Sequence, residues 1–285
     1  MFKKEKLSRV VILGANSFIG KAIVKKFKNR NIKSVLLTRK EVDLEKKQST
    51  KKLKQILKKG DTVIFIAAVA PVKNIEMLNQ NLIICKNIVE TLKIKKPNHL
   101  VYISSDAVYS DSRKKINEKS ETTPGSFHGF MHLIRENMLN ELDCLKCFIR
   151  PTLVFGSSDP HNGYGPNKFI RCAQKNEQII LFGKGEEQRD HIHVDNVAEI
   201  VFGSVIKKIS GIINAVSGNV ISFNEISKNL KKIYPNLIVK TSKRNGPMPH
   251  NGYRVFDNKL LRKKFPDIAI IKLSDWIKKK ELYKI

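Results

Sequence analysis

The chain has 285 residues, 41% of them apolar, and a formal net charge of +28. Its length suits one large domain, or one domain with a smaller appended lobe. No apolar run approaches the roughly 18–20 residues of a membrane helix, and the run 10–13 after the basic N-terminus is too short for a signal-peptide core. We therefore expect a cytoplasmic protein without membrane insertion.

The positive charge and the cysteines carry little functional information. The lysines are scattered along the whole chain, which indicates a solvated surface rather than a nucleic-acid site, although it would also attract phosphorylated ligands. Steep, salt-dependent DNA binding would revive the nucleic-acid hypothesis. Cys144 and Cys147 form a C-x2-C, but no second pair follows at zinc-finger spacing, so we expect reduced thiols and no metal.

The first half of the chain alternates buried strands and amphipathic helices. We expect strands at 9–14, 34–39, 61–70, 99–105 and 147–156, and helices at 17–30, 51–60, 77–94 and 128–142. Continuous apolar strands between such helices predict βαβ units, and hence an α/β fold with a Rossmann-type, doubly wound parallel sheet.

The pattern loosens after residue 156. We expect a Pro/Gly/Asn-rich loop at 157–167, helical periodicity near 221–233 and a last helix at 274–283. This division predicts a dinucleotide-binding core at 1–156, with contributions from about 186–215. A smaller C-terminal substrate-binding lobe would comprise 157–185 and 216–285.

A glycine pattern stands where the first strand turns into the first helix. Gly14 and Gly20 would permit a tight turn and close helix packing, and the helix N-terminus offers free N–H groups to a pyrophosphate. The context of a βαβ series favours dinucleotide binding over a chance turn. The middle position is Ser17, so the backbone must approach the phosphates around a small side chain.

The end of the second strand bears on cofactor choice. An acidic residue there would bind the ribose 2′-OH of NAD, whereas Arg39, after Thr38, would accommodate a 2′-phosphate. This favours NADP over NAD. Asp43 and Leu44 could meet the adenine, or simply form a turn.

Several blocks resemble the extended short-chain dehydrogenases/reductases, and more narrowly the nucleotide-sugar epimerase/dehydratase/reductase group. They are GANSFIG, DTVIFIAAVA, VYISSDAVY, IRPTLVFG, LFGKGEEQRDHIHVDNVA and INAVSGNVIS. The resemblance covers nearly the whole chain and implies a Rossmann domain with a small substrate lobe. The positions it implies for contacts with NADP or NAD are Gly14, Asn16, Ser17, Phe18, Ile19, Gly20, Thr38, Arg39, Asp43, Leu44, Ala67, Ala68, Asn81, Ser104, His132 and Pro151.

Family chemistry implies a Ser/Thr, a Tyr and a Lys, and this chain keeps only the first. Ser105, four residues before Tyr109, matches the Ser/Thr. The Tyr-x-x-x-Lys that opens the next helix in the family reads here as His128 to His132, with Glu136 following. Both the acid/base Tyr and the cofactor-binding Lys are therefore replaced by histidine.

Three interpretations of the histidine pair remain open. Imidazole titrates near neutral pH, so His128 could exchange a proton with a sugar oxygen, assisted by Ser105. His132, charged or donating, could bind the ribose, and a charged His132 would depress the pKa of His128. Alternatively the site is degenerate and non-catalytic. A zinc site would need a third ligand, which no motif supplies.

The resemblance also implies substrate contacts. Arg189 and Arg254 match arginines that bind the diphosphate of a nucleotide sugar, for which guanidinium pairs are suited; surface salt bridges are the alternative. Tyr164 and Asn167 could touch the sugar, but Tyr164 to Lys168 lies in an expected loop and is rejected as the catalytic pair. Asp106 is a further candidate substrate contact. Dehydratases of the family carry a Glu directly after this Asp, whereas Ala107 follows here, which argues against 4,6-dehydration.

The sequence thus predicts an NAD(P)-dependent nucleotide-sugar epimerase or 4-keto-reductase in surface polysaccharide synthesis. The alternative is a catalytically degenerate protein of the same fold that binds dinucleotides or nucleotide sugars. A homodimer through the two long helices is a family expectation.

Overall fold

The computed structural model describes residues 8–160 and 162–279, which form two compact units. Among the described residues, the first unit comprises 8–110, 121–151 and 197–214, and the second comprises 111–120, 152–160, 162–196 and 215–279. Residues 111–120 and 186–196 pack within the second unit, so the chain alternates between units more finely than the sequence division.

The first unit carries the predicted Rossmann-type sheet. Its elements are β1 (Val10–Leu13), α1 (Phe18–Asn29), β2 (Ser34–Leu37), α2 (Ser49–Ile56), β3 (Thr62–Phe65), α3 (Ile75–Lys95), β4 (His99–Ile103), the 3-10 helix η1 (Asp106–Val108), α4 (Phe127–Asn140), β5 (Leu145–Pro151), most of α6 (Val194–Ile206) and β9 (Gly211–Ala215). Among the described residues, the strands form a six-stranded sheet in the order β2-β1-β3-β4-β5-β9. The pairs β1–β2, β1–β3, β3–β4 and β4–β5 are parallel, which confirms the predicted fold class.

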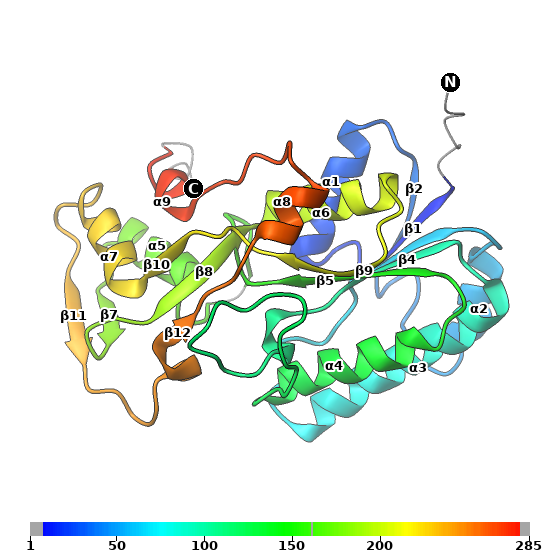
Figure 1. Cartoon of the computed structure of the whole chain (residues 1–285), viewed down its shortest axis with the longest axis horizontal. Coiled ribbons are helices and arrows are strands. Elements are labelled where there is room, and N and C mark those ends of the chain that lie inside the picture. Colours follow the sequence, from blue (N-terminus) through cyan, green and yellow to red (C-terminus); the bar gives the residue numbers. More distant parts are fainter. Residues whose placement is uncertain (1–7, 161, 280–285) are drawn as a thin grey trace. The chain divides into compact units, whose positions relative to one another are not determined.

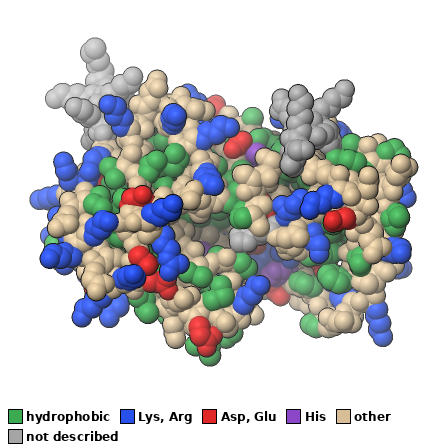
Figure 2. All heavy atoms as spheres, turned by 180° about the vertical axis from the view of Figure 1, so that it is seen from behind, with side chains coloured by type: hydrophobic (Ala, Val, Ile, Leu, Met, Phe, Trp, Pro, Cys, Tyr) green, Lys and Arg blue, Asp and Glu red, His purple; other side chains and the backbone are tan. Residues whose placement is uncertain are grey.

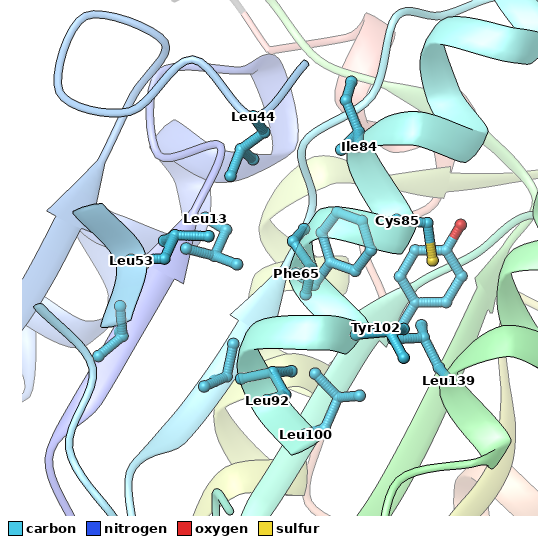
Figure 3. Packing of buried hydrophobic residues seen from close by; sticks show 14 of the residues in the cluster. Leu13, Leu44, Leu53, Phe65, Ile84, Cys85, Leu92, Leu100, Tyr102 and Leu139 are labelled. Atoms are coloured by element: carbon cyan, nitrogen blue, oxygen red, sulfur yellow. The ribbon is translucent and has the colours of Figure 1, made fainter. Parts of the chain in front are cut away.

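Helices cover both faces of this sheet because the strands are apolar on both sides. β1 and β3 are buried at every position. Helices α3 and α4 run side by side over one face, and α1 packs on α6, where Phe27 meets Phe202 edge to face at 5.3 Å (Figure 1). The core under α3 includes Phe65, Cys85 and Tyr102 (Figure 3).

The second unit is built from short elements. They are β6 (Leu153–Phe155), α5 (Pro166–Gln174), β7 (Ile179–Phe182), β8 (Gln188–His193), β10 (Val220–Ser222), α7 (Phe223–Lys231), β11 (Val239–Ser242), the 3-10 helix η2 (Pro249–Gly252), β12 (Tyr253–Arg254), α8 (Lys259–Lys264) and α9 (Leu273–Ile277). Strand β8 is central and pairs with β6, β10 and β12. An aromatic core around Phe155, Phe169, Phe223 and Trp276 holds the unit together.

Three sequence expectations differ from the structure. The strand expected at 147–156 is two strands, because β5 ends at Pro151 and β6, which begins at Leu153, pairs with β8 instead of the first sheet. The loop expected at 157–167 ends inside α5, which begins at Pro166, a residue whose fixed φ suits the first turn of a helix. The last helix ends at Ile277, and positions 280–283 of the expected helix lie outside the described residues.

The basic side chains are dispersed over the surface rather than gathered in one patch. Figure 2 shows lysine and arginine side chains spread over the visible face among other residue types, without one continuous basic tract. Within 8–160 and 162–279, no helix combines the length and apolar character that crossing a bilayer requires.

Candidate active site

The turn between β1 and α1 depends on glycine at two positions. Gly14 has φ +94°, and a Cβ there would lie 2.7 Å from the backbone nitrogen of Ala67. A Cβ on Gly20 would lie 2.3 Å from the carbonyl oxygen of Gly14. The Ser17 hydroxyl donates to that carbonyl at 2.8 Å and accepts from Gly20 N–H at 3.1 Å, capping the helix. No acidic side chain stands in the first turn of α1, so its positive end is available to an anion.

A cavity of about 380 Å³ opens at this turn. The predicted cofactor positions that line it are Gly14, Asn16, Ser17, Thr38, Arg39, Asp43, Leu44, Ala67 and Ala68. Phe18, Ile19, Gly20, Asn81, Ser104, His132 and Pro151 are not part of its lining. The residues fit a dinucleotide, because glycine occupies the two places where any side chain would collide with the backbone that forms the cradle.

Charged side chains form a small network at the rim of the cavity, next to β2. The Arg39 side chain is 70% exposed and pairs with Glu45 at 2.6 Å and Asp43 at 3.6 Å. Glu41 accepts hydrogen bonds from the Thr38 N–H and hydroxyl, which lower the pKa of its carboxyl group. Exposed ion pairs contribute little stability, so Arg39 can exchange these partners for another anion at low cost.

Asn81 supports the wall of the cavity rather than lining it. Its fully buried amide accepts from Val69 N–H at 3.0 Å and donates to the carbonyls of Val69 and Met77. It also accepts from Nη2 of Arg135 at 2.8 Å. The side-chain oxygen and nitrogen are thus engaged in fixing the loop after β3 against α3 and α4.

The catalytic candidates of the first unit meet at η1 and the start of α4. Ser105 caps η1, and its hydroxyl accepts from Ala107 N–H at 3.1 Å. Gly129 allows the first turn of α4 to lie directly on η1, because a Cβ there would lie 2.1 Å from the carbonyl oxygen of Ala107. This packing brings His128 to the segment that carries Ser105 and Asp106.

His128 and His132 are neighbours, as their spacing on α4 predicts. Their rings lie edge to face with centroids 4.8 Å apart. His132 is buried, and its Nδ1 lies 2.7 Å from the Tyr102 hydroxyl on β4. Burial, followed by the charges of His128 and Arg135, lowers the pKa of His132 well below its usual value. Of the two possibilities left open for His132, charged or donating, these surroundings disfavour the charged form.

Behind the histidines a buried ion pair fixes α4 to β5. Glu136 accepts from Arg150 Nε at 2.9 Å and Nη2 at 2.5 Å, and from the Ser104 hydroxyl at 2.6 Å. Burial lowers the pKa of Arg150, but its bonds to Glu136 outweigh this and raise it overall. Ser104 is thereby a link between the sheet and α4, and Pro151 ends β5 beside this pair.

In the second unit the two predicted diphosphate arginines are adjacent. Arg254 on β12 and Arg189 on β8 are Cα partners across a parallel pair of strands. The Arg254 side chain is 1% exposed, and its Nη1 lies 3.4 Å from Asp111, which also contacts His250 at 2.5 Å. The guanidinium is thus held by a half-exposed carboxylate that the sequence analysis did not single out.

Tyr164 and Asn167 have packing roles in the second unit. The Tyr164 ring lies among Phe169, Phe182 and Phe223, and its hydroxyl accepts from Phe182 N–H at 3.3 Å. Asn167 is buried and bonds Gly156 and Asp159, closing the loop before α5. Neither arrangement points to a substrate contact.

Neither metal nor disulfide features in the described residues. Within them, no group of three or more His, Cys, Asp or Glu side chains could hold a metal ion, and all four cysteines are free. Burial raises the pKa of Cys147 to about 12, so this thiol stays protonated.

The sequence did not single out Tyr102, whose hydroxyl contacts His132, or Arg135, whose charge acts on it. Tyr102 lies in an apolar strand where an aromatic residue is unremarkable. Arg135 carries a clearer signal, because a charged residue three positions after His132 falls on the buried face of α4.

Comparisons with known proteins place the chain in a family. The family model described as "NAD dependent epimerase/dehydratase family" matches residues 10–214. A dTDP-D-glucose 4,6-dehydratase from Dictyostelium discoideum is 24% identical over 281 residues, covering 80% of this chain and 62% of that protein. An ADP-L-glycero-D-manno-heptose-6-epimerase from Brachyspira hyodysenteriae is 24% identical over 261 residues, covering 79% of this chain and 81% of the relative.

A solved structure supports the same fold. The UDP-glucose 4-epimerase of Thermus thermophilus, in complex with NAD, superposes with a TM-score of 0.82 at 20% identity, covering 97% of this chain and 99% of that one. The family match spans the sheet, the glycine turn, Ser105 and the histidine pair. This chain is a member of the NAD-dependent epimerase/dehydratase family.

Proposed function

We propose that the chain is an NAD(P)-dependent enzyme that epimerises or reduces the sugar of a nucleotide-diphosphate sugar. The observation that carries the proposal is the glycine cradle at Gly14 and Gly20, which opens into the cavity of the same unit that holds Ser105 and His128. The related dehydratase and epimerase act on nucleotide sugars by their names, which supports this substrate class. A cytoplasmic role in surface polysaccharide synthesis belongs to the same proposal.

The residues of the chain have distinct roles in this mechanism. Gly14, Ser17 and the start of α1 would hold the pyrophosphate, and the bound cofactor supplies hydride acceptor or donor capacity. Ser105 would donate a hydrogen bond to the reacting sugar oxygen. His128 would take the proton from that oxygen during oxidation, or return it during reduction.

A panel of nucleotide sugars and their 4-keto derivatives, incubated with NADPH or NAD, tests the activity. The wild type should turn over at least one member, and His128→Ala should lower kcat by roughly 100-fold, the scale of acid–base catalysis. Unchanged turnover in His128→Ala would remove the assignment. His99→Ala is a matched control, in which another imidazole of the same unit, bonded to the Ile209 carbonyl, is lost.

We also propose a preference for NADP. Arg39 on the cavity rim can exchange Glu45 and Asp43 for a 2′-phosphate, whereas the side chain at the end of β2 is Thr38 rather than an acidic residue. Arg39→Ala should weaken NADPH binding by about tenfold or more and leave NADH binding within about twofold. Equal losses for both cofactors would contradict the preference. Bound NAD released on denaturation would instead favour an epimerase.

The adjacent Arg189 and Arg254 support a diphosphate group as the anchor of the substrate. Two guanidiniums on neighbouring strands suit an anion with several acceptor oxygens. Arg189→Gln should raise KM for the nucleotide sugar by about tenfold with little effect on kcat. Loss of kcat without a change in KM would point to a different anchor.

A homodimer through α3 and α4 completes the proposal. Phe127, Phe130 and Ile134 recur at helical spacing on α4, and all three are exposed, as are Ile83 and Ile94 on α3. Contiguous exposed apolar surface marks protein interfaces. Phe130→Glu with Ile134→Lys should convert a dimer to a monomer in sedimentation velocity. A wild type that sediments as a monomer at micromolar concentration would refute this part.

A second candidate is a non-catalytic protein that binds the same ligands. The observation favouring it is that His132 is buried, where burial and neighbouring charges lower its pKa, so the charge that the family lysine supplies is disfavoured at residue 132. It predicts cofactor binding without isotope exchange at any sugar carbon. Exchange at one sugar carbon would exclude it.

A further inference from the structure

We propose that Tyr102 is a positioning residue that fixes His132 as the neutral Nε2–H tautomer, making His132 an uncharged hydrogen-bond donor beside His128. The tautomer itself follows from contacts within the first unit. Its role in turnover rests on the proposed function.

The contact between Tyr102 and His132 is short and buried. The hydroxyl oxygen lies 2.7 Å from Nδ1, and the side chains are 0% and 6% exposed as residues. Two further aromatic rings pack against that of Tyr102: Phe65 and Phe148, with ring centroids 5.0 Å and 6.2 Å away. Figure 3 shows the hydroxyl directed away from Leu92 and Leu100, along the side where Cys85 lies.

The direction of this hydrogen bond follows from the Tyr102 hydroxyl itself. Within residues 8–160 and 162–279, Nδ1 of His132 is the one hydrogen-bond partner of this hydroxyl. Burial raises the pKa of Tyr102, so the hydroxyl keeps its proton, and that buried proton would have no acceptor if Nδ1 were the donor. That proton is available to Nδ1 of His132. A neutral imidazole that accepts at Nδ1 carries its hydrogen at Nε2.

The positive charge of the cluster formed by Tyr102, His132 and Arg135 resides on Arg135. This side chain is fully buried and donates to the carbonyl oxygen of Asn81 at 2.7 and 3.0 Å, and to that of Ala67 at 3.0 Å. Its hydrogen bonds to Asn81 and Ala67 go to neutral oxygens, and its guanidinium also lies 5.1 Å from the Phe65 ring centroid. Such a cation strongly disfavours a second positive charge nearby in a medium of low polarity.

The groups that face His132 oppose its protonation, carry no charge, or, in the case of the one carboxylate, are already paired. His128 and Arg135 on α4 oppose its protonation. Tyr102 on β4 and Cys85 on α3 remain protonated because burial raises the pKa of each group. Glu136, the nearest carboxylate on α4, is engaged by Arg150 and Ser104. His132 therefore offers Nε2–H without a charge, and the cation of this cluster is three residues further along the helix.

Histidine 15N–1H correlation spectra of the full-length protein test the tautomer directly. His132→Gln identifies the His132 signals among the seven histidines. The wild type should show the Nε2–H pattern, unchanged from about pH 8 to about pH 5.5, a range in which a free imidazole titrates. An Nδ1–H pattern, or titration near the usual histidine pKa, would overturn the proposal without reference to any substrate.

Tyr102→Phe tests the positioning role against a matched control, Tyr109→Phe. Tyr109 is also a buried tyrosine, and its hydroxyl donates to Asn214 at 2.7 Å. Tyr102→Phe should give His132 a mixture of tautomers and lower kcat about tenfold or more, with KM for the sugar nucleotide preserved. Tyr109→Phe should leave both the spectrum and kcat within about twofold. Equal effects of the two substitutions would reduce Tyr102 to a packing residue.

The two proposals fail in different ways. If the wild type binds no dinucleotide but shows the Nε2–H pattern, the proposed function fails and the tautomer assignment stands. If the wild type is active with His132 as Nδ1–H, the reverse holds. If Tyr102→Phe does not fold, the wild-type spectrum alone decides the tautomer.

Discussion

Removing the charge of Glu136 should destabilise the first unit far more than removing an exposed carboxylate. The Glu136 and Arg150 side chains are 5% and 3% exposed, and two hydrogen bonds join them. Glu136→Gln leaves the guanidinium buried without its counterion. Breaking a buried pair in this way costs about 3–5 kcal/mol, a large part of the roughly 5–15 kcal/mol that separates folded from unfolded domains.

Urea denaturation followed by circular dichroism measures this loss, and thermal melting should show a fall of roughly 6–20 °C. Glu141→Gln is the matched control, because Glu141 and Lys93 form an ion pair with side chains 60% and 51% exposed. It should cost under about 1 kcal/mol. Glu136→Leu combined with Arg150→Leu should recover most of the stability, since no charge is then left unpaired. Equal losses in the two single variants would refute the reasoning.

Three further predictions concern buried groups. His191 has a pKa lowered to about 3 by burial, below its unfolded value, so the unfolded state binds a proton first as pH falls. The contribution of His191 to the free energy of unfolding is therefore complete above about pH 6.5 and decreases by about 2 kcal/mol by pH 5. His191→Phe should flatten the fall of unfolding free energy over that range. An unchanged slope would contradict this reasoning. Gly129→Ala should force α4 away from the Ala107 carbonyl and reduce both melting temperature and turnover; wild-type values for both would show that the close approach is unnecessary. Asn81→Ala should cost about 2–4 kcal/mol, because Arg135 and the loop after β3 lose their shared partner, whereas a loss below about 1 kcal/mol would mean that water replaces the amide.

The fold could be predicted because its signals are local. The apolar strands and the amphipathic helices of the first unit have the periods of buried sheet and half-buried helix, and α1, α3 and α4 begin and end within two residues of their predicted bounds. The switch at Thr152 could not be predicted, since it depends on the pairing of β6 with β8, a strand that lies later in the chain.

The site could be predicted only in part, for the same reason. The glycine turn is local, and so is the spacing of His128 and His132. The protonation of His132 depends on the Tyr102 hydroxyl of β4, which contacts it, and on the charge of Arg135 further along α4. Likewise, Asp111 meets Arg254 across 143 positions in the sequence.

Dinucleotide binding at the β1–α1 turn is the central claim, and isothermal titration of the protein with NADPH and NAD tests it most directly. The wild type should bind at one site per chain. Gly14→Ala should lose binding by about 100-fold or more, because its Cβ would meet the backbone of Ala67 where φ is +94°. A folded wild type that shows no saturable binding of either dinucleotide, or a Gly14→Ala variant that binds as well as the wild type, would contradict the account.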